Sequence, residues 1–138
     1  MPKVSHTTDL PVPAQAVWTV IGGFNALPDW HPAVEKSETK DEDGGRLRTL
    51  SLVGGGTIVE KLDKSDDKER TYSYSILSGP LPVANYQSTI RVRESGMGCT
   101  VEWSSEFDAE GAPENDATAA IRGIYEAGLA NLQKMFGA

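Results

Sequence analysis

Residues 115–136, NDATAAIRGIYEAGLANLQKMF, repeat apolar and small side chains three and four positions apart. This period is typical of one face of an amphipathic helix. Asn115 or Asp116 can cap the helix by accepting a hydrogen bond from its first free N–H groups. At 1.5 Å per residue the helix would be roughly 30 Å long. Its expected inner stripe consists of Ile121, Ile124, Tyr125, Gly128, Leu129, Leu132 and Met135.

The chain before this helix is a series of short strand patterns with turn residues between them. The six predicted strands are Val34–Asp41, Arg46–Val53, Thr57–Asp63, Glu69–Leu77, Asn85–Glu94 and Cys99–Ala109. The turns include Asp43-Gly44-Gly45, Gly54-Gly55-Gly56 and Ser78–Pro82. Strands in series with turns between them are typical of an antiparallel meander.

The N-terminal part adds one strand and two short helices. Lys3–Leu10 alternates as a strand does, and Pro13 suits the first turn of a helix that Gly22-Gly23 ends. We expect Asn25–Trp30 to form a second short helix, ended by Pro32. A sheet and one long helix can both bury their apolar sides only if the sheet wraps round the helix. We therefore expect an α+β fold with a seven-stranded curved antiparallel sheet, as one domain spanning residues 1–138.

Charge and composition disfavour several kinds of partner and site. The 138 residues carry a net charge of −7, which disfavours a nucleic-acid partner. Cys99 is the only cysteine, so no internal disulfide can form, and one Cys with two His is too few for a zinc site. Two uncharged segments, Leu10–Pro28 and Thr71–Ile90, contain too many Pro, Gly and polar residues to span a membrane. No signal peptide opens the chain, so we expect a cytoplasmic protein.

Strand alternation places two ionisable side chains on an inner face that is otherwise apolar. Arg48, Leu50 and Leu52 share that face with Ile58, Glu60 and Leu62. With the hairpin centred on Gly55, Leu50 would face Glu60 and Arg48 would be its diagonal neighbour. An unpaired buried charge is costly. We therefore expect Arg48 and Glu60 to pair, or to share water in a cavity.

The interior is predicted to be incompletely filled. Ala120, Gly123, Ala127 and Gly128 lie on or beside the inner stripe of the long helix. Two interior glycines in a helix require a reason, which is either close packing of helix on sheet or space for a ligand. Polar side chains on the inner strand faces favour the second, because each buried polar atom needs a partner. These polar residues are Arg48, Glu60, Tyr72, Tyr74, Tyr86 and Ser88.

The stretch PDWHPAV, residues 28–34, places Trp30 and His31 between two prolines. It would join the second short helix to the second strand at the rim of the cavity. His31 would then either lean inward toward a ligand or be a solvated rim residue, with Trp30 as packing.

The order of elements resembles the helix-grip fold of the START/Bet v 1-like (SRPBCC) superfamily, in its polyketide cyclase/dehydrase-like branch. The similar segments are VPAQAVWTVIGGF, PDWHPAV, GGGTIVEKLD, YSYSILSGPLPVANYQSTI and VEWSSEF. The chain is also similar to the plant abscisic-acid receptors at Glu60-Lys61-Leu62 and at Asn85-Tyr86-Gln87-Ser88. That family's pocket lysine falls at His31, its gate loop at Gly54-Gly55-Gly56 and its second loop at Leu81-Pro82-Val83. These departures remove the parts needed for hormone-gated partner binding, so that activity is not carried over.

Function is expected to depend on the cavity. The first hypothesis is binding of a small, mostly apolar ligand with a polar or anionic head, where His31 and Arg48 meet an anion. The expected ligand-binding residues are His31, Arg48, Leu50, Leu52, Ile58, Glu60, Tyr72, Tyr74, Ile76, Leu81, Tyr86, Ser88, Trp103, Gly123, Ile124, Ala127 and Asn131. No metal or cofactor is expected, and the protein would be a monomer or a homodimer.

Two other hypotheses stay open. The protein would be a cyclase or dehydratase if His31 and Glu60 formed an acid–base pair, although no recognised catalytic motif is present. Alternatively, the loops at Gly54–Gly56 and Pro80–Val83 would be the contact edge of a partner-binding module. His6 and Cys99 have structural roles as their simplest interpretation.

Overall fold

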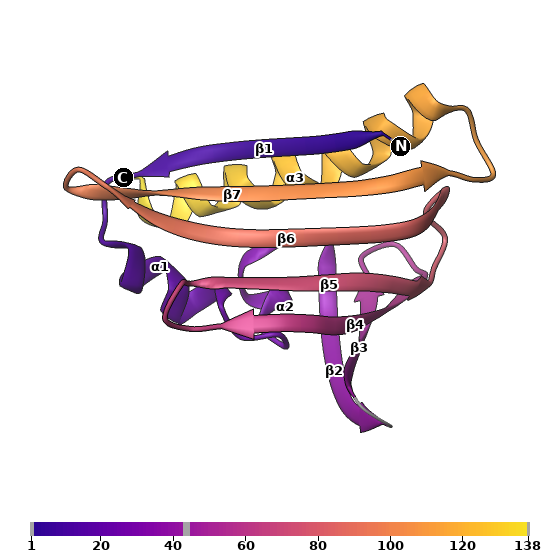
Figure 1. Cartoon of the computed structure of the whole chain (residues 1–138), viewed down its shortest axis with the longest axis horizontal. Helices are drawn as coiled ribbons and strands as arrows, with labels where there is room; N and C mark the ends of the chain where they lie inside the picture. Colours follow the sequence, from indigo (N-terminus) through magenta and orange to yellow (C-terminus); the bar gives the residue numbers. More distant parts are fainter. Residues whose placement is uncertain (1, 43–44, 138) are drawn as a thin grey trace.

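A computed structural model describes residues 2–42 and 45–137. Seven antiparallel strands form one sheet in the order β1-β7-β6-β5-β4-β3-β2 (Figure 1). The strands are β1 (Lys3–Leu10), β2 (Val34–Glu42), β3 (Gly45–Leu52), β4 (Thr57–Asp66), β5 (Thr71–Ser78), β6 (Val83–Ser95) and β7 (Gly98–Ala109). The predicted turn at Asp43-Gly44 lies outside the described residues.

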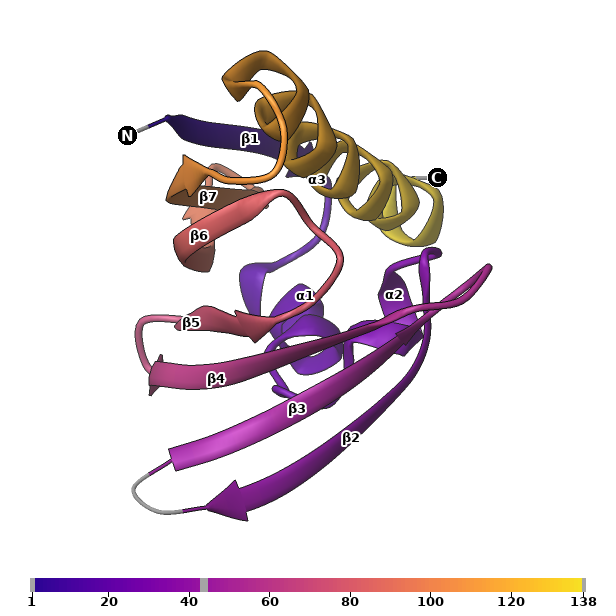
Figure 2. The same cartoon turned by 90° about the vertical axis from the view of Figure 1, so that its right-hand side faces the viewer.

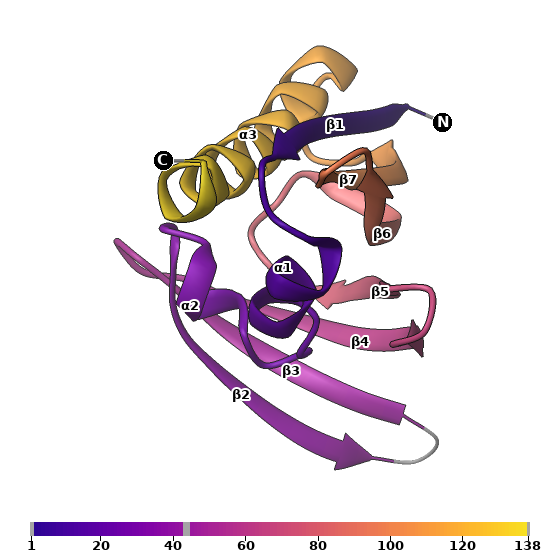
Figure 3. The ribbon, with the colours of Figure 1, turned by 90° about the vertical axis from the view of Figure 1, so that its left-hand side faces the viewer.

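All three helices lie on the same side of the sheet, which curves round them (Figures 2 and 3). They are α1 (Ala14–Ile21), α2 (Leu27–Trp30) and α3 (Glu114–Phe136). The long helix α3 packs on β1 and β7 and also touches α2. The seven-stranded α+β helix-grip architecture expected from the sequence is therefore confirmed. None of the helices in residues 2–42 and 45–137 has the length and apolar character needed to cross a membrane.

Local sequence explains where the helices begin and end. All four apolar residues predicted for the first helix, Ala14, Val17, Trp18 and Ile21, are buried. Gly22 follows them because a Cβ there would lie 2.5 Å from the Trp18 ring. The predicted cap of α3 is wrong. The helix begins at Glu114, and Pro113 occupies the cap position, where its side chain has no oxygen that could accept a hydrogen bond.

The predicted register of the β3–β4 hairpin is wrong. Arg48 lies directly opposite Glu60, and Leu50 lies opposite Ile58, not opposite Glu60. The last ladder pair is Ser51 with Thr57, so the turn is centred on Gly54, one residue before the expected Gly55. The amide of Leu52 donates to the Gly56 carbonyl at 3.0 Å and closes this turn. In this register Arg48 and Glu60 are direct cross-strand neighbours and not the diagonal neighbours that we expected.

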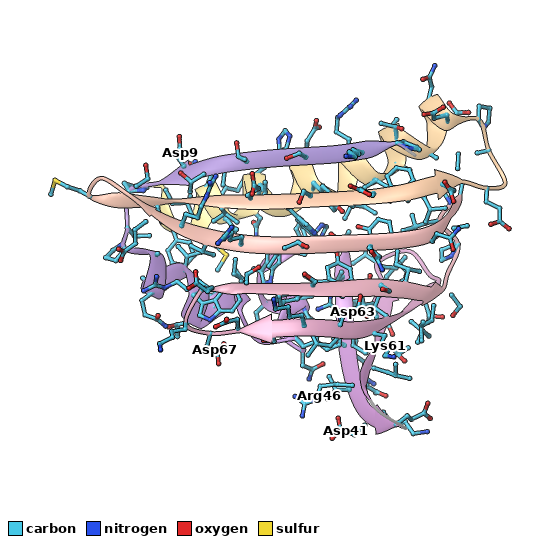
Figure 4. All side chains as sticks on the ribbon, viewed as in Figure 1. Asp9, Asp41, Arg46, Lys61, Asp63 and Asp67 are labelled. Atoms are coloured by element: carbon cyan, nitrogen blue, oxygen red, sulfur yellow. The ribbon has the colours of Figure 1, made fainter. Side chains whose placement is uncertain are left out.

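The two faces of the sheet differ in polarity. Figure 4 looks onto the face away from the helices, where charged residues such as Asp9, Lys61 and Asp63 lie. Trp103, Phe107, Ile90 and Tyr74 are buried on the opposite face. This alternation is what a half-buried antiparallel sheet requires, and it leaves one concave, mainly apolar side toward the helices.

Candidate functional site

A cavity of about 240 Å³ lies between the concave face of the sheet, helices α2 and α3, and the loops that follow β3 and β5. Its wall is mostly apolar. A larger groove of about 560 Å³ crosses the outer face of the sheet, but Ser, Thr and Gln residues dominate its lining. The inner cavity is therefore the candidate site, since small-molecule sites are concave and mostly apolar with a few polar groups.

Many residues that the sequence predicted for the site line this cavity. They are His31, Leu50, Leu52, Ile58, Glu60, Tyr74, Ile76, Leu81, Tyr86, Trp103 and Ile124. The prediction missed Leu27, Ala33, Val34, Val53 and Gly55, which also line it. Ala33 and Val34 belong to PDWHPAV, and Gly55 belongs to the glycine turn predicted as a gate, so the sequence already pointed to these three. Val53 was predicted as the end of the strand Arg46–Val53.

Three predicted site residues on α3 are wrongly placed. Gly123 is exposed, and a Cβ on it would meet no atom within 4 Å. Ala127 is half-buried outside the cavity lining, and Asn131 instead donates its side-chain amide to the Trp30 carbonyl at 2.9 Å. The buried stripe runs through Ala117, Ile121, Tyr125, Gly128, Leu129 and Leu132. Gly123 lies two residues from both Ile121 and Tyr125, which is the far side of a helix with 3.6 residues per turn.

Gly128 shows that close packing explains the small residue on the buried stripe. A Cβ at this position would lie 2.7 Å from His31 Cδ2 and 3.0 Å from the rings of Trp30 and Trp103. The helix thus approaches the end of α2 and the sheet closely at this point. Of the two explanations that the sequence left open, packing holds at Gly128.

Arg48 and Glu60 form a buried ion pair. The Nε of Arg48 donates to Glu60 Oε1 at 2.7 Å, and Nη1 donates to the Phe24 carbonyl at 2.7 Å. The guanidinium also lies 4.2 Å from the centre of the Phe24 ring and 4.9 Å from that of Tyr74. The expectation that Arg48 and Glu60 pair is confirmed.

The two partners differ in their access to the cavity. The Arg48 side chain is 0% exposed and does not line the cavity, whereas Glu60 is 6% exposed and does. Tyr72 and Ser88, also predicted for the site, are likewise absent from the lining. Burial raises the pKa of Glu60, and the guanidinium of Arg48 opposes that rise. The carboxylate therefore faces the cavity with its countercharge behind it.

His31 is held by the backbone through both ring nitrogens. Nδ1 accepts the amide proton of Ala33 at 3.1 Å, so Nε2 carries the ring proton and donates it to the Ile124 carbonyl at 2.7 Å. Burial lowers the pKa of His31, although the bond to Ile124 opposes the shift. The imidazole is neutral, and it ties the end of α2 to α3. The predicted solvated rim position is wrong, since His31 is only 2% exposed.

A network of hydroxyls lies behind the cavity, and its donors can be assigned. Ser88 Oγ donates its single proton to the Ser104 carbonyl at 2.9 Å, so it accepts from Trp103 Nε1 at 3.1 Å and from Tyr125 at 2.9 Å. Tyr125 in turn accepts from the hydroxyl of Tyr86. The proton of Tyr86 is therefore engaged, and only its lone pairs remain for the cavity. Tyr125 connects Tyr86 to Ser88 in this network, and the sequence predicted it only as part of the inner stripe of the long helix.

Tyr74 differs from Tyr86 because its hydroxyl proton is not used in a hydrogen bond within the part of the chain that the structure describes. Its hydroxyl accepts from Trp103 Nε1 at 3.0 Å, sharing the single indole proton with Ser88, and no acceptor for the proton of Tyr74 lies among the described residues. Burial raises the pKa of Tyr74 well above that of a free phenol, so the proton stays in place. Tyr74 can therefore donate into the cavity.

The two loops at the mouth are in contact range of each other. Gly54, Gly55 and Gly56 have φ angles of +91°, +107° and +96°, which favour glycine. A Cβ on Gly56 would lie 3.8 Å from Pro80 in the other loop. The lining includes Val53 and Gly55 from the first loop and Leu81 from the second. Movement of the glycine loop on ligand binding stays a prediction.

Comparison with known families gives one match over almost the whole chain. Residues 1–137 match the family described as polyketide cyclase/dehydrase and lipid transport. A carrot protein, Dau c 1 isoallergen Dau c 1.0401, is 33% identical over 123 residues, which cover 75% of this chain and 79% of the carrot protein. Abscisic acid receptor PYL2 of Arabidopsis thaliana is 28% identical over 94% of this chain and 73% of the receptor. For the rice receptor PYL10 the match spans only 48% of the receptor's length.

Solved structures agree with the same fold. The protein XoxI of Bacillus cereus is 41% identical and superposes with a TM-score of 0.92, over 99% of this chain and 96% of that one. A START superfamily protein of Mycobacterium smegmatis is 12% identical, with a TM-score of 0.81 over 98% and 97% of the two chains, and shares the fold alone. The resemblance to the START/Bet v 1-like superfamily and, more distantly, to the abscisic-acid receptors is confirmed.

Proposed function

Because the chain belongs to the polyketide cyclase/dehydrase and lipid transport family, we propose that it binds a small, mostly apolar molecule in the inner cavity. The observation that carries this proposal is the cavity wall. Leu50, Leu52, Ile58, Ile76 and Ile124 surround the space with aliphatic side chains. Contact between such an apolar wall and an apolar ligand, in place of water, lowers the free energy of the complex.

The volume limits the size of the ligand. A cavity of ~150 Å³ is known to hold one benzene ring. By proportion, the 240 Å³ found here holds a molecule of about ten non-hydrogen atoms if the walls do not move. The ligand is therefore of the size of a fused two-ring compound or a medium-length chain.

The hydrogen bonds of His31 and Glu60 support binding over acid–base catalysis. Neither ring nitrogen of His31 is free, so His31 cannot complete an acid–base pair with Glu60, whose Oε1 is held by Arg48. A general acid or base must reach the proton that it transfers. The cyclase or dehydratase alternative gains no support from this arrangement.

Native mass spectrometry of the purified protein tests the proposal. We expect a small molecule to co-purify, and naphthalene to bind when it is added to ligand-free protein. Ile124→Trp should abolish both signals, because Ile124 faces the cavity from α3 and the indole would fill it. Ala130→Trp is the matched control on the exposed side of the same helix and should keep both. Equal binding by the two variants would refute the cavity as the site.

A further inference from the structure

We infer that the head group of the ligand is an uncharged hydroxyl, so the ligand class is an apolar alcohol or phenol rather than a carboxylic acid. This inference rests on the proposed function and specifies its ligand. It starts from the polar groups that remain free on the cavity wall once every described hydrogen bond has been assigned.

Glu60 provides an acceptor. Its Oε1 accepts from Arg48, and within residues 2–42 and 45–137 no donor reaches Oε2. Glu60 lines the cavity while its guanidinium partner does not. A carboxylate oxygen on the cavity wall that has no protein donor can accept a proton from water or from a ligand.

Tyr74 provides a donor next to that acceptor. Glu60 pairs with Ile76 across the β4–β5 ladder and Leu62 pairs with Tyr74, which makes Glu60 and Tyr74 diagonal neighbours on the same face. Both side chains line the cavity. A hydroxyl can donate to Glu60 Oε2 and accept from Tyr74 at the same time, which an ether, a ketone or an ammonium group cannot do.

The charges argue against an anionic head. The cavity lining as described contains no Lys or Arg, and the neutral His31 donates its one ring proton to Ile124. A ligand carboxylate would therefore meet the Glu60 carboxylate first, because the Arg48 guanidinium lies behind Glu60 and does not line the cavity. This reverses the expectation from the sequence, in which Arg48 and His31 received an anion.

Four naphthalene probes of similar size separate these cases by isothermal titration calorimetry at neutral pH. 2-Naphthol should bind roughly 10-fold tighter than 2-methoxynaphthalene, which accepts but cannot donate, and than 2-methylnaphthalene. 2-Naphthoate should bind most weakly. Equal affinities of 2-naphthol and 2-methylnaphthalene, or tightest binding of 2-naphthoate, would overturn the hydroxyl assignment and leave the proposed function standing. Absence of binding by all four would overturn both.

A pair of tyrosine variants tests the same assignment independently. Tyr74→Phe should weaken 2-naphthol roughly 5- to 10-fold and leave 2-methylnaphthalene unchanged. Trp103 Nε1 keeps Ser88 as its acceptor in this variant, so the fold should persist. Tyr72→Phe is the control, because that hydroxyl contacts Arg48 at 3.4 Å and Tyr72 does not line the cavity. Equal losses in the two variants would contradict the role of Tyr74.

Discussion

At the scale of single residues, the buried pair Arg48–Glu60 stands out because its guanidinium is fully enclosed yet only partly satisfied. Nε and Nη1 have partners, while Nη2 has none among the described residues. Aromatic rings of Phe24 and Tyr74 cover its faces. Such a pair is costly to desolvate and still more costly to break. We interpret it as the support that fixes Glu60 at the cavity wall.

Arg48→Met should therefore destabilise the protein by about 3–5 kcal/mol, since it leaves the Glu60 carboxylate buried and unpaired. The measurement is urea unfolding at neutral pH. Arg46→Met is the matched control, because Arg46 pairs with Asp41 at the surface, where a change below about 1 kcal/mol is expected. Similar decreases in the free energy of unfolding for the two variants would show that the buried pair stabilises the protein no more than a surface pair does.

His31 predicts a pH dependence of stability. Its pKa is lowered in the folded protein by burial, so the unfolded chain takes up the proton first as pH falls. The contribution of His31 to the free energy of unfolding is fully present above about pH 6.5, which is the pKa of histidine in the unfolded chain. Below that pH it is lost with a slope of at most about 1.4 kcal/mol per pH unit. His31→Gln should remove this slope, and His6→Gln should retain it. An unchanged slope in His31→Gln would contradict the neutral, backbone-bound imidazole.

At the scale of elements, α3 carries two glycines with opposite surroundings. Gly123→Ala should stabilise the protein by up to about 1 kcal/mol, because the new methyl group points into solvent from a helix interior. Gly128→Ala should destabilise it by about 1–3 kcal/mol, because the methyl group would press on His31, Trp30 and Trp103. Thermal unfolding measures both. Stabilisation by Gly128→Ala would mean that the helix does not pack this closely.

The two mouth loops should respond differently to ligand. Residues 54–56 are three glycines with positive φ, while residues 80–82 contain two prolines. We expect 2-naphthol to slow hydrogen exchange in the first loop and to leave the second unchanged. Equal protection of both loops would argue against a gate formed by the glycines.

At the scale of the whole molecule, the sequence predicted the architecture well and the site only in part. Strand alternation identified the inner residues of β3, β4 and β5, because a period of two leaves little ambiguity about faces. It could not locate the hairpin centre to one residue, which depends on how the backbone turns through Gly54, Gly55 and Gly56. The helical period separates Gly123 from Gly128, because Gly123 lies opposite Ile121 and Tyr125; the close packing at Gly128, however, depends on tertiary contacts that the sequence does not report. The polarity of Tyr74 and Tyr86 depends on hydrogen bonds between distant strands and α3, which no local pattern reports.

Methyl NMR during titration with 2-methylnaphthalene tests whether an apolar molecule binds in the cavity between the sheet and α3. We predict shifts of methyl groups that line the cavity, among them those of Leu50, Ile58, Ile76, Leu81 and Ile124. Val92 and Val101, buried outside the lining, should not move. Shifts confined to the methyl group of Thr89, in the groove on the outer face, or no shift at all, would contradict binding in the cavity.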